Sequence, residues 1–255
     1  MPRRQPVSSA VGSPAWSSLS TKRRIEQAAL QLFAAKGFEA TGIRDIAERA
    51  GISTAALYHY MGSKDELLID FMLFSMTQLT HVARAALAAA EGPAAELATL
   101  VRVHVGFHTL DPQRSLVADD ELRALSEAAF ARVMELRDAY ERLWADTLER
   151  GLGSGIFDFS DARITRLALL EMCNGVARWY SDAGPMRPGQ IADAFTDLAL
   201  ATVGAGRGSQ PPQLEDLRSL PTSDVLNLIE RQLGAADATD SSVSSVAVPR
   251  SAGVA

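Results

Sequence analysis

The sequence predicts an all-α fold, on three observations. Ala and Leu are abundant, whereas the alternation of Val, Ile or Thr with polar residues that marks β-strands is scarce. Apolar residues recur every three or four positions over most of the chain after residue 20, which is the spacing of a helix with a buried face. Glycine and proline stand between these segments, where helices end.

The chain divides into four stretches. Residues 1–18 are rich in Ser, Pro, Ala and Gly without periodicity, so we expect them to be disordered. Residues 19–65 form an N-terminal head of three short helices, and residues 66–203 a larger helical body. In the C-terminal tail, 204–255, periodicity returns only over 214–233, so we expect at most one more helix there and disorder from residue 234.

Composition excludes several classes of protein. No apolar stretch has the length of a membrane span, and the N-terminus lacks the apolar region of a secretory signal. Cys173 stands alone, so one chain cannot form an internal disulfide or a site of several cysteines. We therefore expect a cytoplasmic protein that does not associate with a membrane. We expect no metal site built from cysteines within one chain. No cofactor motif is visible.

Charge is distributed unevenly along the chain. The whole chain has a formal charge of −6, but residues 1–64 carry nine basic and four acidic side chains, a local charge of +5. The remaining residues therefore carry −11. A basic head on an acidic body suits a head that faces phosphate groups.

The head contains a helix-turn-helix pattern. Apolar residues recur at helical spacing over 43–50, and Gly51 suits the left-handed residue that ends a helix. Ser53 is a good N-cap for a second helix over 54–60, and Ser63, followed three residues later by glutamate, begins a longer one. Short capped helices also occur in other helical domains, but helix, glycine turn and helix is the arrangement that places a recognition helix in the major groove of DNA.

Positions within this pattern assign roles toward DNA. Thr54, Ala55 and His59 are expected to face base edges, and the hydroxyls of Tyr58 and Tyr60 to reach phosphates. Basic and hydroxyl side chains at helix starts favour further phosphate contacts. The complete set of expected DNA-binding residues is Thr41, Arg44, Ser53, Thr54, Ala55, Tyr58, His59, Tyr60 and Lys64.

The residue content of this segment resembles the signature of the TetR family of bacterial repressors. The matching positions are Gly51, Ser53, Leu57, Tyr58, His59, Tyr60, Ser63, Lys64, Leu67 and Leu68, with further agreement over 34–38 and 40–47. Ala55 and Met61 depart from it, where the family often has Gly and Phe. The resemblance supports Thr41, Arg44, Tyr58, His59 and Lys64 as DNA contacts. It also implies a dimer on a near-palindromic operator and a body that binds a small molecule.

The body reads as a succession of helices. After a long helix from Ser63 to about Ala90, the expected segments are 94–110, 112–126, 127–150, 161–183 and 188–203. The last two are apolar on more than one side, so each needs two packing partners. One is the chain's own core, and we expect the other to be the same surface of a second subunit, giving a homodimer through a four-helix interface. Burial within a single subunit is the alternative.

Aromatic and polar residues inside the body helices are candidate effector contacts, although each also suits an ordinary core. Asn174 and Arg178 are favoured, because a polar pair one turn apart in an apolar helix must find partners, and Arg178 would suit a carboxylate or phosphate. The ligand-binding set is His104, Phe107, His108, Trp144, Asn174, Arg178 and Trp179; Tyr140, Met134 and Met172 are further candidates.

His104 and His108 are also one turn apart, the spacing of two metal ligands on a helix face. A third ligand would have to come from His81, Asp119 or Glu121, so a metal-responsive repressor is kept as an alternative, while hydrogen-bonded core histidines are the default and no metal residue is assigned. A helical enzyme is a further alternative, but no catalytic triad, phosphate loop or paired acidic site is visible, so we expect no enzyme.

Three body segments resemble a TetR subgroup common in actinobacteria: 103–108, 121–125 and 174–180. Members of that subgroup are associated with fatty-acid or sterol catabolism and respond to acyl-CoA thioesters. This resemblance implies a ligand-responsive repressor that a small hydrophobic effector of that class releases from DNA. The acidic body speaks mildly against a strongly anionic effector.

Overall fold

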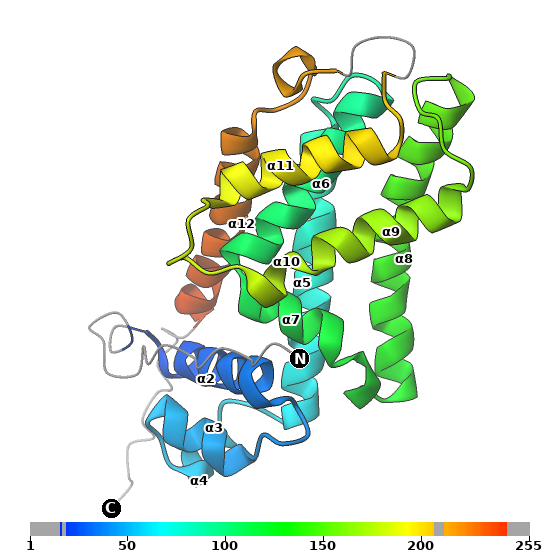
Figure 1. Cartoon of the computed structure of the whole chain (residues 1–255). Helices are drawn as coiled ribbons and strands as arrows, with labels where there is room; N and C mark the ends of the chain where they lie inside the picture. Colours follow the sequence, from blue (N-terminus) through cyan, green and yellow to red (C-terminus); the bar gives the residue numbers. More distant parts are fainter. Residues whose placement is uncertain (1–15, 17–18, 207–211, 244–255) are drawn as a thin grey trace, which may run out of the picture.

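A computed structural model of the chain describes residue 16, residues 19–206 and residues 212–243 (Figure 1). All regular structure within these residues is helical, which confirms the predicted class. The elements in chain order are α2 (Thr21–Lys36), α3 (Ile43–Ala50), α4 (Thr54–Leu57), α5 (Lys64–Leu87), α6 (Pro93–Leu110), α7 (Pro112–Asp120), the 3₁₀ turn η1 (Leu122–Ala124), α8 (Glu127–Gly153), α9 (Ala162–Asn174), α10 (Val176–Trp179), α11 (Pro188–Thr202), the 3₁₀ turn η2 (Leu214–Asp216) and α12 (Thr222–Val243).

The head consists of α2, α3 and α4, whose ends are fixed by local capping. Gly51 adopts φ 71° and its N–H closes the last turn of α3, while the Ser53 hydroxyl accepts a hydrogen bond from the Ala56 N–H at 3.1 Å and opens α4. The core of the head centres on Phe33, whose ring meets those of Phe38 and Phe71 edge-on at 5.2 and 6.2 Å.

The recognition helix is shorter than the expected 54–60. Its α-helical part is α4, after which the N–H groups of His59 and Tyr60 donate to carbonyls only three residues back, at 3.1 and 2.9 Å. The end of the segment is therefore wound as tight turns, which carry it toward Ser63 and the start of α5.

Helix α5 belongs to both parts of the molecule. It begins with the expected capping box, in which Ser63 and Glu66 satisfy each other's backbone N–H groups. Its first half buries Leu68 and Phe71 in the head core, and its second half buries Leu79 and Val82 in the body core. It ends at Leu87 rather than near Ala90.

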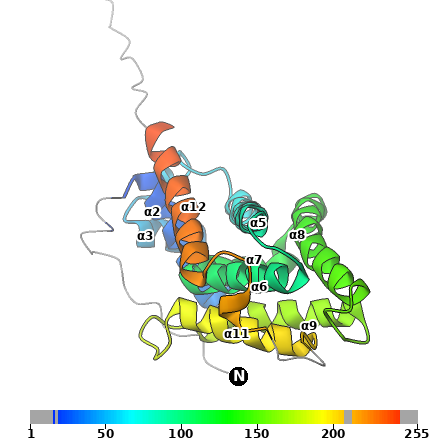
Figure 2. The ribbon, with the colours of Figure 1, turned by 90° about the horizontal axis from the view of Figure 1, so that it is seen from above.

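The body is arranged around α6, which is buried on every side. Seen from above, α6 lies at the centre with α12 on one side and α5 and α8 on the other, while α9 and α11 run along a third side (Figure 2). Trp144 and Leu148 of α8, Leu169 of α9 and Ala199 of α11 are fully buried in this core. Helix α7 extends from the end of α6 and packs against α2 of the head.

The expected helix over 161–183 is interrupted. Helix α9 ends at Asn174, Gly175 forms the junction, and the single turn of α10 follows. Glycine is the weakest helix former apart from proline, which accounts for a break at this position. The expected segment 112–126 is likewise divided into α7 and η1, whereas the 127–150 segment continues to Gly153.

The C-terminal segment is more ordered than the sequence predicts. The expected helix over 214–233 begins only at Thr222, since Pro221 disfavours helix in the residue before it, and it continues past residue 234 to Val243. Val225 and Ile229 of α12 are fully buried against the body. The expected disorder of 244–255 lies outside the described residues.

Of the N-terminal stretch 1–18, only Trp16 is described, and its ring is buried in the head core. The expectation of disorder is wrong for this residue, while the other positions lie outside the described residues. Within the part of the chain that the structure describes, no helix combines the length and apolar character needed to cross a membrane.

Candidate DNA-binding surface and effector site

The head presents one exposed surface around α4. Ser53, Ala55, Tyr58 and His59 are exposed there, Thr54 is half-buried, and the Tyr58 side chain is 59% exposed. An exposed tyrosine of this size in the small head is unusual for a residue with only a packing role. Arg44 at the start of α3 is exposed as well, so these six predicted DNA-binding residues are accessible to a nucleic acid.

Three other predicted DNA-binding residues face elsewhere. Thr41 is buried and its hydroxyl donates to the Gly37 carbonyl at 2.8 Å, so this hydroxyl is not available to a phosphate. Tyr60, although half exposed, lines a cleft between the head and the body. The Lys64 ammonium donates to the carbonyls of Phe38 and Thr41 at 2.9 and 3.1 Å.

Lys64 therefore has an intramolecular role. Its Nζ lies 3.9 Å from the centre of the Phe38 ring, so the charge is held both by carbonyl oxygens and by an aromatic face. These contacts tie the start of α5 to the connection between α2 and α3. The expectation of a phosphate contact at Lys64 came from its place at a helix start, a feature that does not reveal such carbonyl partners.

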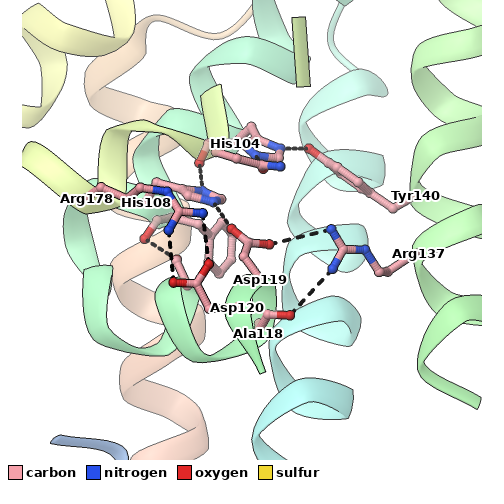
Figure 3. A network of polar contacts seen from close by, with 11 residues as sticks. His104, His108, Ala118, Asp119, Asp120, Arg137, Tyr140 and Arg178 are labelled. Atoms are coloured by element: carbon pink, nitrogen blue, oxygen red, sulfur yellow. Dashed lines mark hydrogen bonds and ion pairs between the residues drawn. The ribbon is translucent and has the colours of Figure 1, made fainter. Parts of the chain in front are cut away.

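In the body, a polar network joins α6, α7 and α8 (Figure 3). His108 Nδ1 lies 2.8 Å from the His104 carbonyl oxygen, so it must carry a hydrogen and donate it. His108 Nε2 lies 3.3 Å from a carboxylate oxygen of Asp119, a contact that also needs a proton between the two atoms. Arg137 of α8 approaches the other Asp119 oxygen at 3.5 Å.

The Asp119 side chain of this pair is ionised. Burial by itself would raise the pKa of Asp119, but the hydrogen bond and charge of His108, helped by Arg137, hold that pKa below its ordinary value. Asp119 is therefore a carboxylate, and the His108 ring faces it through Nε2. This buried contact joins two consecutive helices, α6 and α7.

His104 stacks on His108 and is uncharged. The two rings are 4.4 Å apart and nearly parallel. Burial, with the charge of His108 as a second cause, lowers the pKa of His104 to about 3. The neutral ring donates from Nε2 to the Asn174 side-chain oxygen at 2.8 Å and accepts at Nδ1 from the Tyr140 hydroxyl at 3.0 Å. Burial raises the pKa of Tyr140, which keeps its proton available for this bond.

The neighbouring residue of α7, Asp120, binds a different helix. Its carboxylate forms two hydrogen bonds with the Arg178 guanidinium of α10, at 2.8 and 2.9 Å, and this pairing raises the pKa of Arg178. Two successive carboxylates thus fasten the end of α7 to α6, α8 and α10 (Figure 3).

A small cavity adjoins this network. We call it the inner cavity; it has a volume of about 70 Å³, lies between α5, α6, α8 and α9, and is lined by polar groups of His104, Asn174 and Arg137 beside Leu79 and Leu170. A volume of this size holds at most about two water molecules. A small-molecule site needs roughly 300 Å³ or more, so the inner cavity is too small for a small-molecule effector in this conformation.

The structure brings together only part of the predicted ligand-binding set. His104, His108 and Asn174 line the inner cavity, and Trp144 meets the His104 ring edge-on at 5.9 Å. Phe107 lines a neighbouring space instead. Arg178 pairs with Asp120, and Trp179 is half exposed with its ring centroid 6.2 Å from that of Phe195, so neither residue lines the inner cavity.

Sequence reasoning missed Arg137 and did not assign Asp119 or Tyr140 to the site. Arg137 lies among charged residues of α8 whose pattern is typical of a solvent-exposed helix face, so nothing in the sequence marks it as part of a buried network. The sequence marks Tyr140 only as a further candidate for an effector contact, and Asp119 only as a candidate third metal ligand.

The alternative of a metal site at His104 and His108 has little support in this geometry. All four ring nitrogens of these histidines already have hydrogen-bond partners. Among the described residues, no group of three or more His, Cys, Asp or Glu side chains is arranged to hold a metal ion.

Replacing Lys64 by Met should lower the thermal stability of the protein. Two carbonyls would lose a charged donor, a loss of about 1–3 kcal/mol in the free energy of unfolding. Arg44→Met, at an exposed site, should leave the melting temperature unchanged and instead reduce the slope of log K against log salt for DNA binding by about one. Calorimetry and binding titrations at several salt concentrations compare the two. A Lys64→Met protein of normal stability with a reduced salt slope would restore its phosphate role.

His104 should make stability depend on pH. Its pKa falls from 6.5 in the unfolded chain to about 3 in the folded protein, so the unfolded chain binds the extra proton between these values. The stabilisation is complete above pH 6.5 and is lost as pH falls toward 3, by up to about 1.4 kcal/mol per pH unit. Urea unfolding between pH 7 and 5 should show a shallower pH dependence for His104→Gln than for wild type. His59→Gln, at an exposed site, serves as the control, and equal slopes in all three proteins would disprove the assignment.

Two sequence profiles of known families match this chain. Residues 25–71 match the profile described as bacterial regulatory proteins, tetR family, and residues 90–203 match that of the tetracyclin repressor-like C-terminal domain. The matches cover the head with the start of α5, and the body from α6 to α11. Helix α12 lies outside both.

Individual proteins agree with this assignment. The chain is 29% identical over 176 residues to the HTH-type transcriptional repressor KstR2 of Rhodococcus jostii, covering 68% of this chain and 85% of the relative. It is 33% identical to the TetR family regulator PfmR of Thermus thermophilus, with a TM-score of 0.63 over 70% of this chain and 97% of that structure. The structure of AibR in complex with isovaleryl coenzyme A and operator DNA shares the fold at 20% identity, with a TM-score of 0.63 and coverage of 70% and 97%. The chain belongs to the TetR family: it is a DNA-binding transcriptional regulator and not an enzyme.

Proposed function

We propose that this regulator is a homodimeric repressor, which binds a palindromic operator through its two heads and is released by a small effector with an apolar part. The observation that carries the proposal is the joint placement of an exposed recognition surface on the head and a small polar cavity in the body, with α7 touching both parts. An acyl-CoA thioester is the effector class we propose.

The case for a dimer rests on apolar side chains that the single chain leaves uncovered. Ile164 on α9 is 62% exposed and Leu198 on α11 is 53% exposed, and Leu167 on α9 and Trp179 on α10 are exposed as well. Helices α9 and α11 run side by side over one face of the body (Figure 1). Apolar residues gathered on one helical face support a self-complementary interface between two copies. Two heads joined in this way would have to present their recognition helices about 34–36 Å apart to reach successive major grooves.

The case for an effector rests on the energetics of the network. The buried contact between His108 and the Asp119 carboxylate gains from its hydrogen bond, but the carboxylate has lost its hydration, so the net stabilisation is small. A ligand that widens the inner cavity and exchanges these contacts therefore has little to overcome. A tenfold loss of operator affinity requires the effector to prefer the DNA-free conformation by only about 1.4 kcal/mol.

The acyl-CoA class is supported by two kinds of similarity. AibR, which shares this fold, has been solved with isovaleryl coenzyme A and operator DNA. The segments 103–108 and 174–180, which resemble acyl-CoA-responsive members of the family, supply His104, His108 and Asn174 to the inner cavity. Leu79 and Leu170 in the same lining provide apolar contacts for an acyl group.

Leu198→Glu should convert the dimer to a monomer, since it places a charge in the apolar interface without disturbing the core of the single chain. Light scattering should show one chain instead of two, and operator binding should weaken strongly. Phe130→Glu on α8, which is also exposed, is the matched control and should remain dimeric. A Leu198→Glu protein that stays dimeric would contradict the proposed interface.

Acyl-CoA thioesters should release the protein from its operator. The operator is first selected from random double-stranded DNA, and bound sequences should contain an inverted repeat. Isovaleryl-CoA, octanoyl-CoA and palmitoyl-CoA are then compared with free coenzyme A, and at least one thioester should weaken binding while coenzyme A alone does not. If no thioester acts but a free carboxylic acid does, the regulator is ligand-responsive and the proposed effector class is wrong.

A further inference from the structure

We propose that the C-terminal helix α12 is a lid over the route by which the apolar part of the effector enters the body, with Leu233 as the gate. This inference rests on the proposed function, because it concerns the path of a small-molecule effector. It assigns a role to a segment that lies beyond the matched family profiles.

A series of spaces leads from the surface to the inner cavity. The outer cleft, about 700 Å³, lies between the head, α5, α7 and α12, and includes Tyr60, Arg114 and Gln232 in its lining. A space of about 20 Å³, here called the middle cavity, lies deeper and is lined by Phe74, Phe107 and Leu233 among others. The middle and inner cavities share Met76, Leu79, His108 and Asp119.

Side chains that line two neighbouring spaces are the walls between them. Phe74 and Arg114 line both the outer cleft and the middle cavity, and Leu233 lines the middle cavity together with a further surface hollow of about 210 Å³ that adjoins the cleft. These three residues lie between the middle cavity and the outer spaces. The His108–Asp119 contact separates the middle cavity from the inner one.

Of the three outer wall residues, Leu233 is the one held least firmly. The Arg114 guanidinium is paired with Asp111 at 2.8 Å and lies over the rings of Phe71 and Phe74 at 5.4 and 4.8 Å. Leu233 is only partly buried and can contribute dispersion contacts alone. Phe74 belongs to the long helix α5, which is anchored in both cores.

Helix α12 is anchored at its beginning, and beside the gate the Gln232 side chain donates to the Gln78 side chain of α5 at 2.5 Å, a bond that opening of the gate must break. Arg102, buried in α6, donates to the Ser219 hydroxyl and the Leu220 carbonyl at 3.0 and 3.2 Å, just before the helix starts. Ile229 packs so closely on Gly106 that a Cβ there would lie 2.5 Å from its Cδ1. Leu233 follows one turn after Ile229, which is fully buried.

The chemistry of the route selects an apolar group with a polar end. Behind the gate, Phe107, Met76 and Leu79 offer an apolar surface that ends at the His108–Asp119 pair. The outer cleft mixes basic residues such as Arg23 and Arg114 with acidic residues such as Glu66 and Asp70. A chain or ring system fits behind Leu233, while the polar end of the same molecule stays in the cleft next to α2 of the head.

The lid is tested without any effector, by the accessibility of a thiol behind the gate. Ala118 is 5% exposed and lines the middle cavity, so Ala118→Cys in a Cys173→Ala background places the sole cysteine of the sequence there. Its rate of reaction with Ellman's reagent reports how often the cavity opens. Leu233→Ala should raise this rate at least about tenfold, since the local opening then exposes less apolar surface.

Two further variants separate a lid from general loosening. Glu230→Ala is exposed on the same helix and should leave the rate unchanged. Gly106→Ala forces α12 outward without altering the gate and should raise the rate, as Leu233→Ala does. Circular dichroism and melting temperatures confirm that each variant is folded. If folded Leu233→Ala and Glu230→Ala proteins react at the same rate, α12 is not a lid.

A binding experiment then distinguishes failure of the lid from failure of the proposed function. Octanoyl-CoA is mixed with wild type and with Leu233→Ala in the full-length protein, and association is followed by tryptophan fluorescence. A faster association for Leu233→Ala supports the route. If Leu233→Ala raises the thiol reactivity but no thioester binds, the lid is supported and the proposed effector class is overturned. Association at the wild-type rate despite faster thiol labelling would show that the effector enters elsewhere and overturn the route.

Discussion

Burial of α6 on all sides is the constraint on which the rest of the body depends. A helix with no solvent-facing side can carry polar residues only if other helices supply their partners, because an unpaired polar group in the interior is costly. Arg102, His104 and His108 are all buried in α6. Their partners come from the segment before α12, from α8 and α9, and from α7, respectively. Three polar side chains therefore fix how three sides of the helix are covered.

The packing around Gly106 shows the same constraint on α6, here through apolar contacts. The absence of a side chain there lets Ile229 approach the backbone of α6, and Leu226 lies close by at 3.0 Å from the position of a Cβ. Close apolar packing of this kind holds α12 against the body, whereas Arg102 holds the segment before α12 through hydrogen bonds. The C-terminal helix is thus an integral part of the body core, even though it lies beyond the residues that match the family profiles.

The sequence predicted best those features whose causes are local. The left-handed Gly51, the cap at Ser53 and the capping box at Ser63 involve residues at most four positions apart, so the helix-turn-helix could be predicted with its boundaries nearly correct. The partners of His104 lie 36 and 70 residues away, and those of Lys64 lie 23 and 26 residues away. Periodicity identifies buried faces but does not say which helices meet, so a ligand role for Arg178 and a phosphate role for Lys64 were reasonable and incomplete predictions.

The position of α7 connects these observations to regulation. Val117 and Ala118 are buried in the core that also holds Phe33 and Leu57 of the head, while the next residue, Asp119, is bound to His108 and Arg137 in the body. Successive residues of a helix are only about 1.5 Å apart along its axis, and close-packed interiors transmit displacement instead of absorbing it. Under the proposed function, an effector that moves Asp119 by more than a fraction of that distance must also move Val117 and Ala118 against the head. Operator affinity then depends on the inner cavity because one short helix belongs to both cores.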